Sequence, residues 1–152
     1  MTKSVVAFTT GTDMNVTYTL TDNHITQLHA LYQQEWWTKG RSIEATRQGI
    51  RGSQICIGIV SDTDELVGFT RVITDYVFKA FVFDVIVRQD ARCLGLGKQL
   101  VALVTTHPKL KSVRHIELYC QPELVPFYEK RGFSSDVGGF QLMRFEPLTK
   151  PA

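Results

Sequence analysis

Apolar residues recur along the chain with two spacings, and the spacing separates predicted strands from predicted helices. Alternating or continuous apolar stretches predict strands at 15–20, 55–60, 66–74, 80–87, 113–120 and 139–145. Apolar residues three or four positions apart, with capping residues or helix breakers beside them, predict four helices: from Thr21 or Asp22 to Lys39–Gly40, from Ser42 to Gly52, over 96–104 before Pro108, and over 124–131 before Gly132.

The order of these segments, β-α-α-β-β-β-α-β-α-β, predicts the fold class. It is typical of an α/β (α+β) domain with a mixed, largely antiparallel sheet and helices on both faces. The run at 80–87 is apolar on both faces, which favours a central strand. A chain of 152 residues without an internal repeat or linker is expected to form one domain over residues 1–152.

Composition and charge narrow the possible partners and compartment. With 43% hydrophobic and 21% charged residues and a net charge of +2, we expect neither a nucleic-acid nor a membrane surface. The first residues do not resemble a signal peptide, which favours a cytoplasmic location. Three widely spaced cysteines predict reduced thiols and no zinc site, and the four histidines have no ligand spacing, so no metal is expected.

Residues 92–100 read RCLGLGKQL and lie between a predicted strand and a predicted helix. Glycines allow close approach of a ligand to the backbone, and the free N–H groups of a helix N-terminus attract phosphate. The Walker pattern fails here because Arg92 and Gln99 stand where it needs Gly and Ser or Thr. A dinucleotide fingerprint fails because Leu100 replaces its third glycine.

A second motif follows about thirty residues later, FYEKRGF at 127–133. Together with R-x-x-G-x-G at 92–97, it resembles the GNAT superfamily of acyl-CoA N-acetyltransferases. Their pyrophosphate loop reads (Q/R)-x-x-G-x-(G/A), and their next helix carries a tyrosine before a Gly-Phe pair. The resemblance covers roughly residues 15–145 and is nearest to the serotonin or arylalkylamine type. Cys93 and Gln121 depart from the family pattern, where Gly and Asn or Asp are usual.

The resemblance implies acetyl-CoA as co-substrate and a set of coenzyme contacts. These would come from the main chain of a splayed strand, from the glycine loop and from the following helix: Val85, Ile86, Val87, Arg92, Cys93, Leu94, Gly95, Leu96, Gly97, Lys98, Gln121 and Tyr128. Arg71 and Arg88 are either further coenzyme contacts or solvated charges. The alternative for the loop is an ordinary strand-to-helix turn with solvated basic residues.

Direct acetyl transfer needs a base for the amine and an acid for the departing sulfur. Tyr128 is the candidate acid, because a phenol with a pKa of about 10 is protonated at neutral pH; alternatively, it is a core aromatic packed on Phe127. Asp84, the one charge in an apolar strand, is the candidate base or a structural carboxylate. Glu35 and Asp75 are further carboxylates, at positions that commonly face water.

The acceptor side is expected near the first two helices, as in the enzymes that the chain resembles. Tyr32, Trp36 and Trp37 there form an aromatic wall for an amine, or simply seat the first helix on the sheet. We expect acetylation of a primary amine of a small molecule. The alternatives are a protein or peptide acceptor and a non-catalytic acyl-CoA sensor. A homodimer is possible through pairing of the terminal strand at 139–145.

Overall fold

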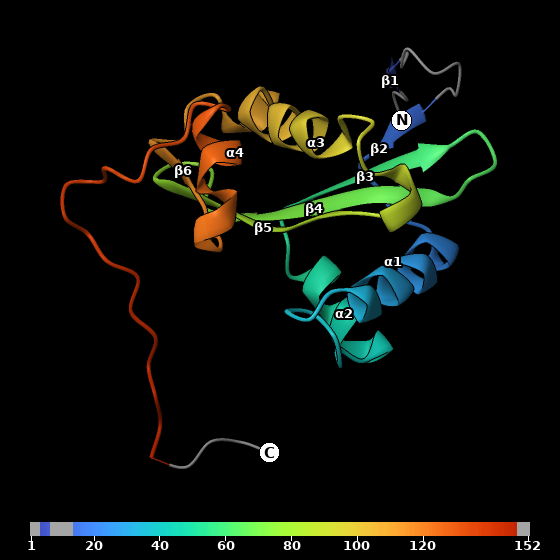
Figure 1. Cartoon of the computed structure of the whole chain (residues 1–152), viewed down its shortest axis with the longest axis horizontal. Coiled ribbons are helices and arrows are strands. Elements are labelled where there is room, and N and C mark those ends of the chain that lie inside the picture. Colours follow the sequence, from blue (N-terminus) through green and yellow to red (C-terminus); the bar gives the residue numbers. More distant parts are fainter. Residues whose placement is uncertain (1–3, 7–13, 149–152) are drawn as a thin grey trace. The chain divides into compact units, whose positions relative to one another are not determined.

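The structure is a computed structural model that describes residues 4–6 and 14–148 (Figure 1). It divides into two compact units, Met1–Tyr119 and Cys120–Ala152. We describe each unit by itself.

The first unit is built on a six-stranded sheet whose strands follow one another in chain order. All neighbouring strands are antiparallel except β5 and β6, which are parallel. The fold is therefore the mixed α/β arrangement that the sequence predicted, with one additional short strand at the start. The strands are β1 (Ser4–Val6), β2 (Met14–Thr17), β3 (Ile55–Ser61), β4 (Leu66–Thr74), β5 (Lys79–Val87) and β6 (His115–Glu117).

Two helices between β2 and β3 begin at the predicted capping residues. Helix α1 (Asp22–Gln34) is capped by the hydroxyl of Thr21, and α2 (Ile43–Arg51) by that of Ser42. The prediction that α1 continues to Lys39–Gly40 is wrong. The hydroxyl of Thr38 donates to the carbonyl of Tyr32 at 2.8 Å and satisfies one of the last carbonyls of α1, so the chain turns after Gln34.

Helices cover both faces of the sheet (Figure 1). On one face, Leu28, Leu31 and Tyr32 of α1 form a core cluster with side chains of the sheet, including Phe69 and Ile86. On the other face, α3 (Leu96–Thr105) buries its apolar stripe against residues that point the opposite way. No helix of the described residues is long and apolar enough to cross a membrane.

A bulge in β5 changes the face to which its side chains point. Arg71 of β4 pairs with Phe83, but Phe69 pairs with Ile86, so β5 contains one additional residue at this point. Asp84 lies there with φ +57°, a backbone angle that is uncommon for a residue other than glycine. Val82 and Val85 both pack on the α3 side, and Asp84 between them contacts Tyr32 of α1.

Short helical turns connect the remaining elements of the first unit. A 3₁₀ turn at Gln89–Ala91 joins β5 to the glycine loop, and another at Pro108–Leu110 follows α3. The first of these places the loop directly after the end of the central strand.

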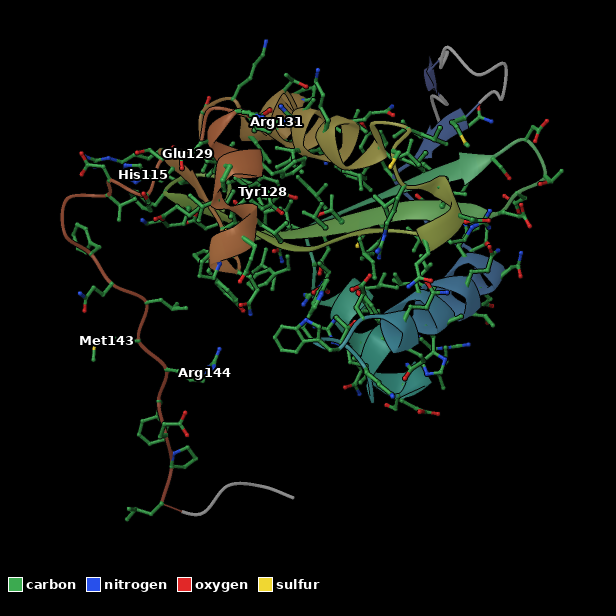
Figure 2. All side chains as sticks on the ribbon, viewed as in Figure 1. His115, Tyr128, Glu129, Arg131, Met143 and Arg144 are labelled. Carbon is green, nitrogen blue, oxygen red and sulfur yellow. The ribbon has the colours of Figure 1, made fainter. Side chains whose placement is uncertain are left out.

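The second unit contains a 3₁₀ turn at Pro122–Leu124 and the short helix α4 (Val125–Glu129). The chain leaves α4 through Gly132, whose φ of +93° suits a residue without a Cβ. The predicted strand at 139–145 is wrong, because these residues pair with no strand in the part of the chain that the structure describes. Met143 and Arg144 lie in this stretch (Figure 2).

Candidate functional site

The glycine loop turns sharply between β5 and α3. Cys93 and Gly95 both have left-handed backbone angles, with φ of +69° and +78°. Gly95 is the N-cap of α3, and a Cβ added there would meet no other atom within 4 Å. The position therefore favours glycine for its backbone angle, not for lack of space.

The loop presents a continuous set of unused backbone donors. The N–H of Arg92 donates to Gln89 at 3.4 Å and that of Gln99 donates to Gly95 at 3.0 Å. Between them, the N–H groups of 93–98 make no hydrogen bond within the described part of the chain. Consecutive free N–H groups at a helix N-terminus, with Lys98 beside them, fit a diphosphate group such as that of coenzyme A.

Arg92 connects this loop to the end of α1. Its Nη2 forms an ion pair with Oε1 of Glu35, the residue that follows α1, and its Nε lies 3.4 Å from the carbonyl of Val87. Glu35 was expected to face water, but its side chain is only 20% exposed. A carboxylate therefore holds the basic residue of the loop in place where the phosphate is expected.

The central strand has an open edge next to β6. Parallel pairing joins only Lys79, Ala80 and Phe81 to β6, whereas β5 continues to Val87. Within the first unit, the edge of Val85, Ile86 and Val87 is therefore not paired by β6. This is the separation of strands that the sequence analysis expected, and it leaves main-chain groups there for a ligand.

Asp84 is the centre of a group of buried and partly buried polar side chains, which we call the Asp84 cluster: Tyr32, Arg41, Arg71 and Asp84. The Oδ2 atom of Asp84 accepts hydrogen bonds from Tyr32 Oη (2.9 Å), Arg41 Nη1 (2.8 Å) and Arg71 Nε (2.7 Å). Its Oδ1 accepts one from Arg41 Nη2 at 3.2 Å. Arg71 is thus not a solvated charge, which was one of the two alternatives for it from the sequence.

The environment of the Asp84 cluster fixes its protonation. Burial alone would raise the pKa of Asp84, but hydrogen bonds and charge from Arg41 and Arg71 outweigh it and lower that pKa. Burial and the neighbouring carboxylate raise the pKa of Tyr32, which is therefore protonated at neutral pH. Asp84 is ionised but weakly basic, which favours the structural alternative for this carboxylate.

Tyr128 lies on α4 in the second unit (Figure 2). Its ring packs edge-on against Phe127 and Phe133, with centroids 5.0 and 5.9 Å apart, and burial raises its pKa to about 12. Its hydroxyl has no hydrogen-bond partner among the described residues. The phenol is therefore protonated at neutral pH and has a donor to spare. Gln121, also in this unit, is exposed.

The three aromatic residues proposed for the acceptor side have different surroundings. Tyr32 is buried, and its ring is covered by the guanidinium of Arg41, whose carbon lies 4.6 Å from the ring centre. That ring seats α1 on the sheet, as the alternative in the sequence analysis had it. Trp36 and Trp37 follow α1 and are 72% and 41% exposed. Of the three, Trp36 and Trp37 have rings exposed to a ligand.

The remaining candidates have local roles. The carboxylate of Asp75 accepts N–H groups of Val77, Phe78 and Lys79, which lower its pKa and shape the turn between β4 and β5. His24 completes the cap of α1, and Arg88 forms ion pairs with Glu65 and Asp90. Among the described residues, no three His, Cys, Asp or Glu side chains gather in a metal-binding arrangement.

Comparisons with known proteins identify the family of the chain. Residues 20–133 match the acetyltransferase (GNAT) family. The chain is 31% identical over 124 residues to the uncharacterized N-acetyltransferase ycf52 of Pyropia yezoensis, covering 80% of this chain and 71% of that protein. It is 37% identical over 79 residues to serotonin N-acetyltransferase 2, chloroplastic, of Oryza sativa subsp. japonica, covering 52% and 40%.

Solved acetyltransferase structures have a similar fold. A GNAT-family acetyltransferase structure from Xanthomonas campestris pv. campestris superimposes with a TM-score of 0.73 at 28% identity, covering 88% of this chain and 93% of the other. A structure from Deinococcus radiodurans R1 gives a TM-score of 0.72 at 23% identity, covering 86% and 87%.

Proposed function

Because the chain belongs to the acetyltransferase (GNAT) family, we propose that it transfers the acetyl group of acetyl-CoA directly to the primary amine of a small molecule. Membership of this family identifies the protein as an acyl-CoA-dependent N-acetyltransferase. The small-molecule acceptor and the roles of individual residues belong to the proposal.

The coenzyme site is proposed because two main-chain surfaces of the first unit have hydrogen-bonding groups without partners among the described residues. The free N–H groups of 93–98 suit the diphosphate, and the open edge of Val85–Val87 suits the amide groups of the pantetheine arm. Both follow from one stretch of chain, since β5 leads into the loop within a few residues. Arg92 and Lys98 add positive charge, and we include Gln121 and Tyr128 of the second unit among the coenzyme contacts.

Tyr128 is the proposed general acid. When the amine nitrogen bonds to the acyl carbon, the carbon–sulfur bond breaks, and the sulfur must receive a proton. A phenol that has no partner among the described residues and a pKa of about 12 carries that proton at neutral pH. The attacking nitrogen meanwhile gives up one proton to solvent water, so the phenolate left at Tyr128 recovers a proton from solvent and the protons balance over the whole step.

For Asp84 we propose a positioning role in place of the general base considered from the sequence. Its Oδ2 atom already accepts three hydrogen bonds, and two guanidinium groups lower its pKa. A carboxylate in this state is a poor acceptor for the proton of an ammonium group. It instead holds Arg41, Arg71 and the bulge of β5 beside the open edge of that strand.

The test is release of free thiol from acetyl-CoA with a panel of small primary amines and, in parallel, lysine-containing peptides. We expect release with at least one small amine and formation of its N-acetyl product. If thiol is released with peptides but with none of the small amines, the acceptor is a protein or peptide and the small-molecule proposal is wrong. Thermal stabilisation by coenzyme A without release in either panel would favour a non-catalytic acyl-CoA sensor.

Two features of the whole protein are also proposals. We place the protein in the cytoplasm, and cell fractionation with a tagged chain tests that location against the chloroplast named for some relatives. We propose a homodimer as the oligomeric state, which light scattering of the purified chain tests directly.

A further inference from the structure

The Asp84 cluster lies beside the open edge of Val85–Val87, where the proposed function places the pantetheine arm. The bulge of β5 directs Asp84 to the α1 side of the sheet, immediately before the open edge of Val85–Val87. An acceptor that reaches the acyl end of the coenzyme from this side would meet the cluster. The inference below rests on the proposed function and names the class of acceptor.

The cluster carries a surplus positive charge. At neutral pH, Arg41 and Arg71 are cationic, Asp84 is ionised and Tyr32 is neutral, because burial and the carboxylate raise its pKa. Two positive charges therefore share one negative charge. The nearby Glu35 does not compensate for the surplus, since it is paired with Arg92.

The two arginines also have hydrogen-bond donors left. A guanidinium has five N–H groups. Arg41 uses two nitrogen atoms on Asp84, and Arg71 uses one on Asp84 and one on Ser53, the latter at 3.3 Å. The Arg41 side chain is 34% exposed and that of Arg71 is 16% exposed. A solvent-borne anion can therefore reach Arg41 directly.

An aromatic surface adjoins these charges. The guanidinium carbon of Arg71 lies 4.9 Å from the ring centre of Phe83. Phe83 packs on Phe81 and Tyr119 with centroids 5.4 and 6.1 Å apart, and Tyr119 is 52% exposed. Phe81, Phe83 and Tyr119 therefore form a partly exposed aromatic surface that Arg71 contacts through Phe83.

From this juxtaposition we propose that the acceptor is an aromatic amine that also carries a carboxylate, as an aromatic amino acid does. The carboxylate binds the guanidinium of Arg41, with Arg71 adding charge, and the ring lies on the surface of Phe81, Phe83 and Tyr119. A positively charged amine without a carboxylate would be repelled by the surplus charge. The acceptor's own carboxylate cancels that repulsion.

The test compares acceptors that differ only in the carboxylate. Tryptophan and tryptamine form one pair, and phenylalanine and phenethylamine form another. For the wild-type protein, we expect kcat/KM for thiol release to be at least about tenfold higher for the member with the carboxylate, the size expected for one charge-assisted hydrogen bond.

Variants distinguish the cluster from general surface charge. Arg41→Gln should reduce this preference by about tenfold by acting on the carboxylate-bearing member of each pair. Arg47→Gln is the matched control, since Arg47 lies on α2 with a 3.9 Å contact to Asp22 and its side chain is 40% exposed. It removes the same charge and should leave the preference unchanged. Where Arg41→Gln fails to fold, the salt dependence of the wild-type preference is measured instead, and the preference should shrink at high salt because it is electrostatic.

The outcomes separate this inference from the proposed function. If tryptamine and phenethylamine are acetylated as well as or better than their partners, the protein is a small-amine acetyltransferase and the carboxylate inference is overturned. If the preference exists but survives Arg41→Gln, or does not respond to salt where that variant does not fold, the Asp84 cluster is only structural and the inference is again overturned. If no small amine releases thiol, the proposed function and the inference both fail.

Discussion

Asp84 shows how a single residue can be identified from the sequence while its partners are not. A carboxylate in an apolar strand requires compensation, and Arg71 is a natural partner because it lies on the neighbouring strand opposite Phe83. Nothing in the sequence indicated Arg41 as a partner of Asp84. It lies 43 positions away in the segment between α1 and α2, and only the folded chain brings it to Asp84.

Replacing Asp84 should destabilise the fold. Asp84→Asn leaves two guanidinium groups around an uncharged side chain, and we expect the free energy of unfolding to fall by about 3 kcal/mol. Asp90→Asn is the control, because that carboxylate is 69% exposed and its loss should change stability little. Urea unfolding of the three proteins measures both differences; equal stabilities would contradict a structural role for Asp84.

The same carboxylate predicts a pH dependence. The pKa of Asp84 is lower in the folded state, so its contribution to stability is fully present above the unfolded pKa of about 3.9 and is lost as pH falls through the folded pKa. The stability difference between wild type and Asp84→Asn should be constant above about pH 5 and shrink at acid pH. Unfolding at several pH values measures it; a difference that grows on acidification would contradict the assignment.

Tyr128 provides the sharpest test of the proposed chemistry. Tyr128→Phe keeps the ring that packs on Phe127 and Phe133 and removes only the hydroxyl. We expect kcat to fall more than about tenfold, as for loss of a general acid. The affinity for coenzyme A, measured by calorimetry, should hardly change. An unchanged kcat would exclude Tyr128 as the acid.

Glu35 is expected to compete with phosphate for Arg92. In Glu35→Gln the ion pair with Arg92 is weakened, so the guanidinium is free to bind a diphosphate. We predict that the dissociation constant for coenzyme A decreases about threefold, less at high salt because the effect is electrostatic. Glu44→Gln, on exposed α2, is a control for lost negative charge. Weaker binding by Glu35→Gln would mean that the ion pair supports the loop instead.

At the scale of elements, the starts of helices were better predicted than their ends. Thr21 and Ser42 cap α1 and α2 through local hydrogen bonds that adjacent residues determine. The end of α1 depends on Thr38 reaching back to Tyr32, and the bulge in β5 depends on pairing with β4. Contacts of this kind have no signature in the periodicity of either segment.

The glycine loop gives a prediction at this scale. Gly95→Ala puts a side chain on a residue with φ +78°, which costs about 1 kcal/mol and favours a different loop conformation. We expect weaker binding of coenzyme A. Gly49→Ala, inside α2 with open space around it, should instead stabilise the fold by about 0.5 kcal/mol without affecting the coenzyme. Calorimetry measures the affinity of both variants for coenzyme A. Wild-type affinity in Gly95→Ala would contradict the proposed role of the loop.

At the scale of the whole molecule, the sequence predicted the sheet, its helices and the family, because each rests on a long pattern or on two motifs in order. The segment 139–145 was the exception. Its alternating apolar residues satisfy the pattern of a strand, but a strand forms only where a neighbour supplies the hydrogen bonds. Phe140 and Phe145 are instead 83% and 86% exposed, so their periodicity did not decide the structure.

The central claim is that the backbone N–H groups of 93–98 bind the diphosphate of the coenzyme. Amide chemical shifts of the labelled protein, followed by NMR during titration with coenzyme A and separately with pantetheine, test it most directly. We predict that the amide protons of 93–98 shift downfield with coenzyme A and stay in place with pantetheine, which has no diphosphate. Binding of coenzyme A that leaves these amide signals unmoved would contradict the account.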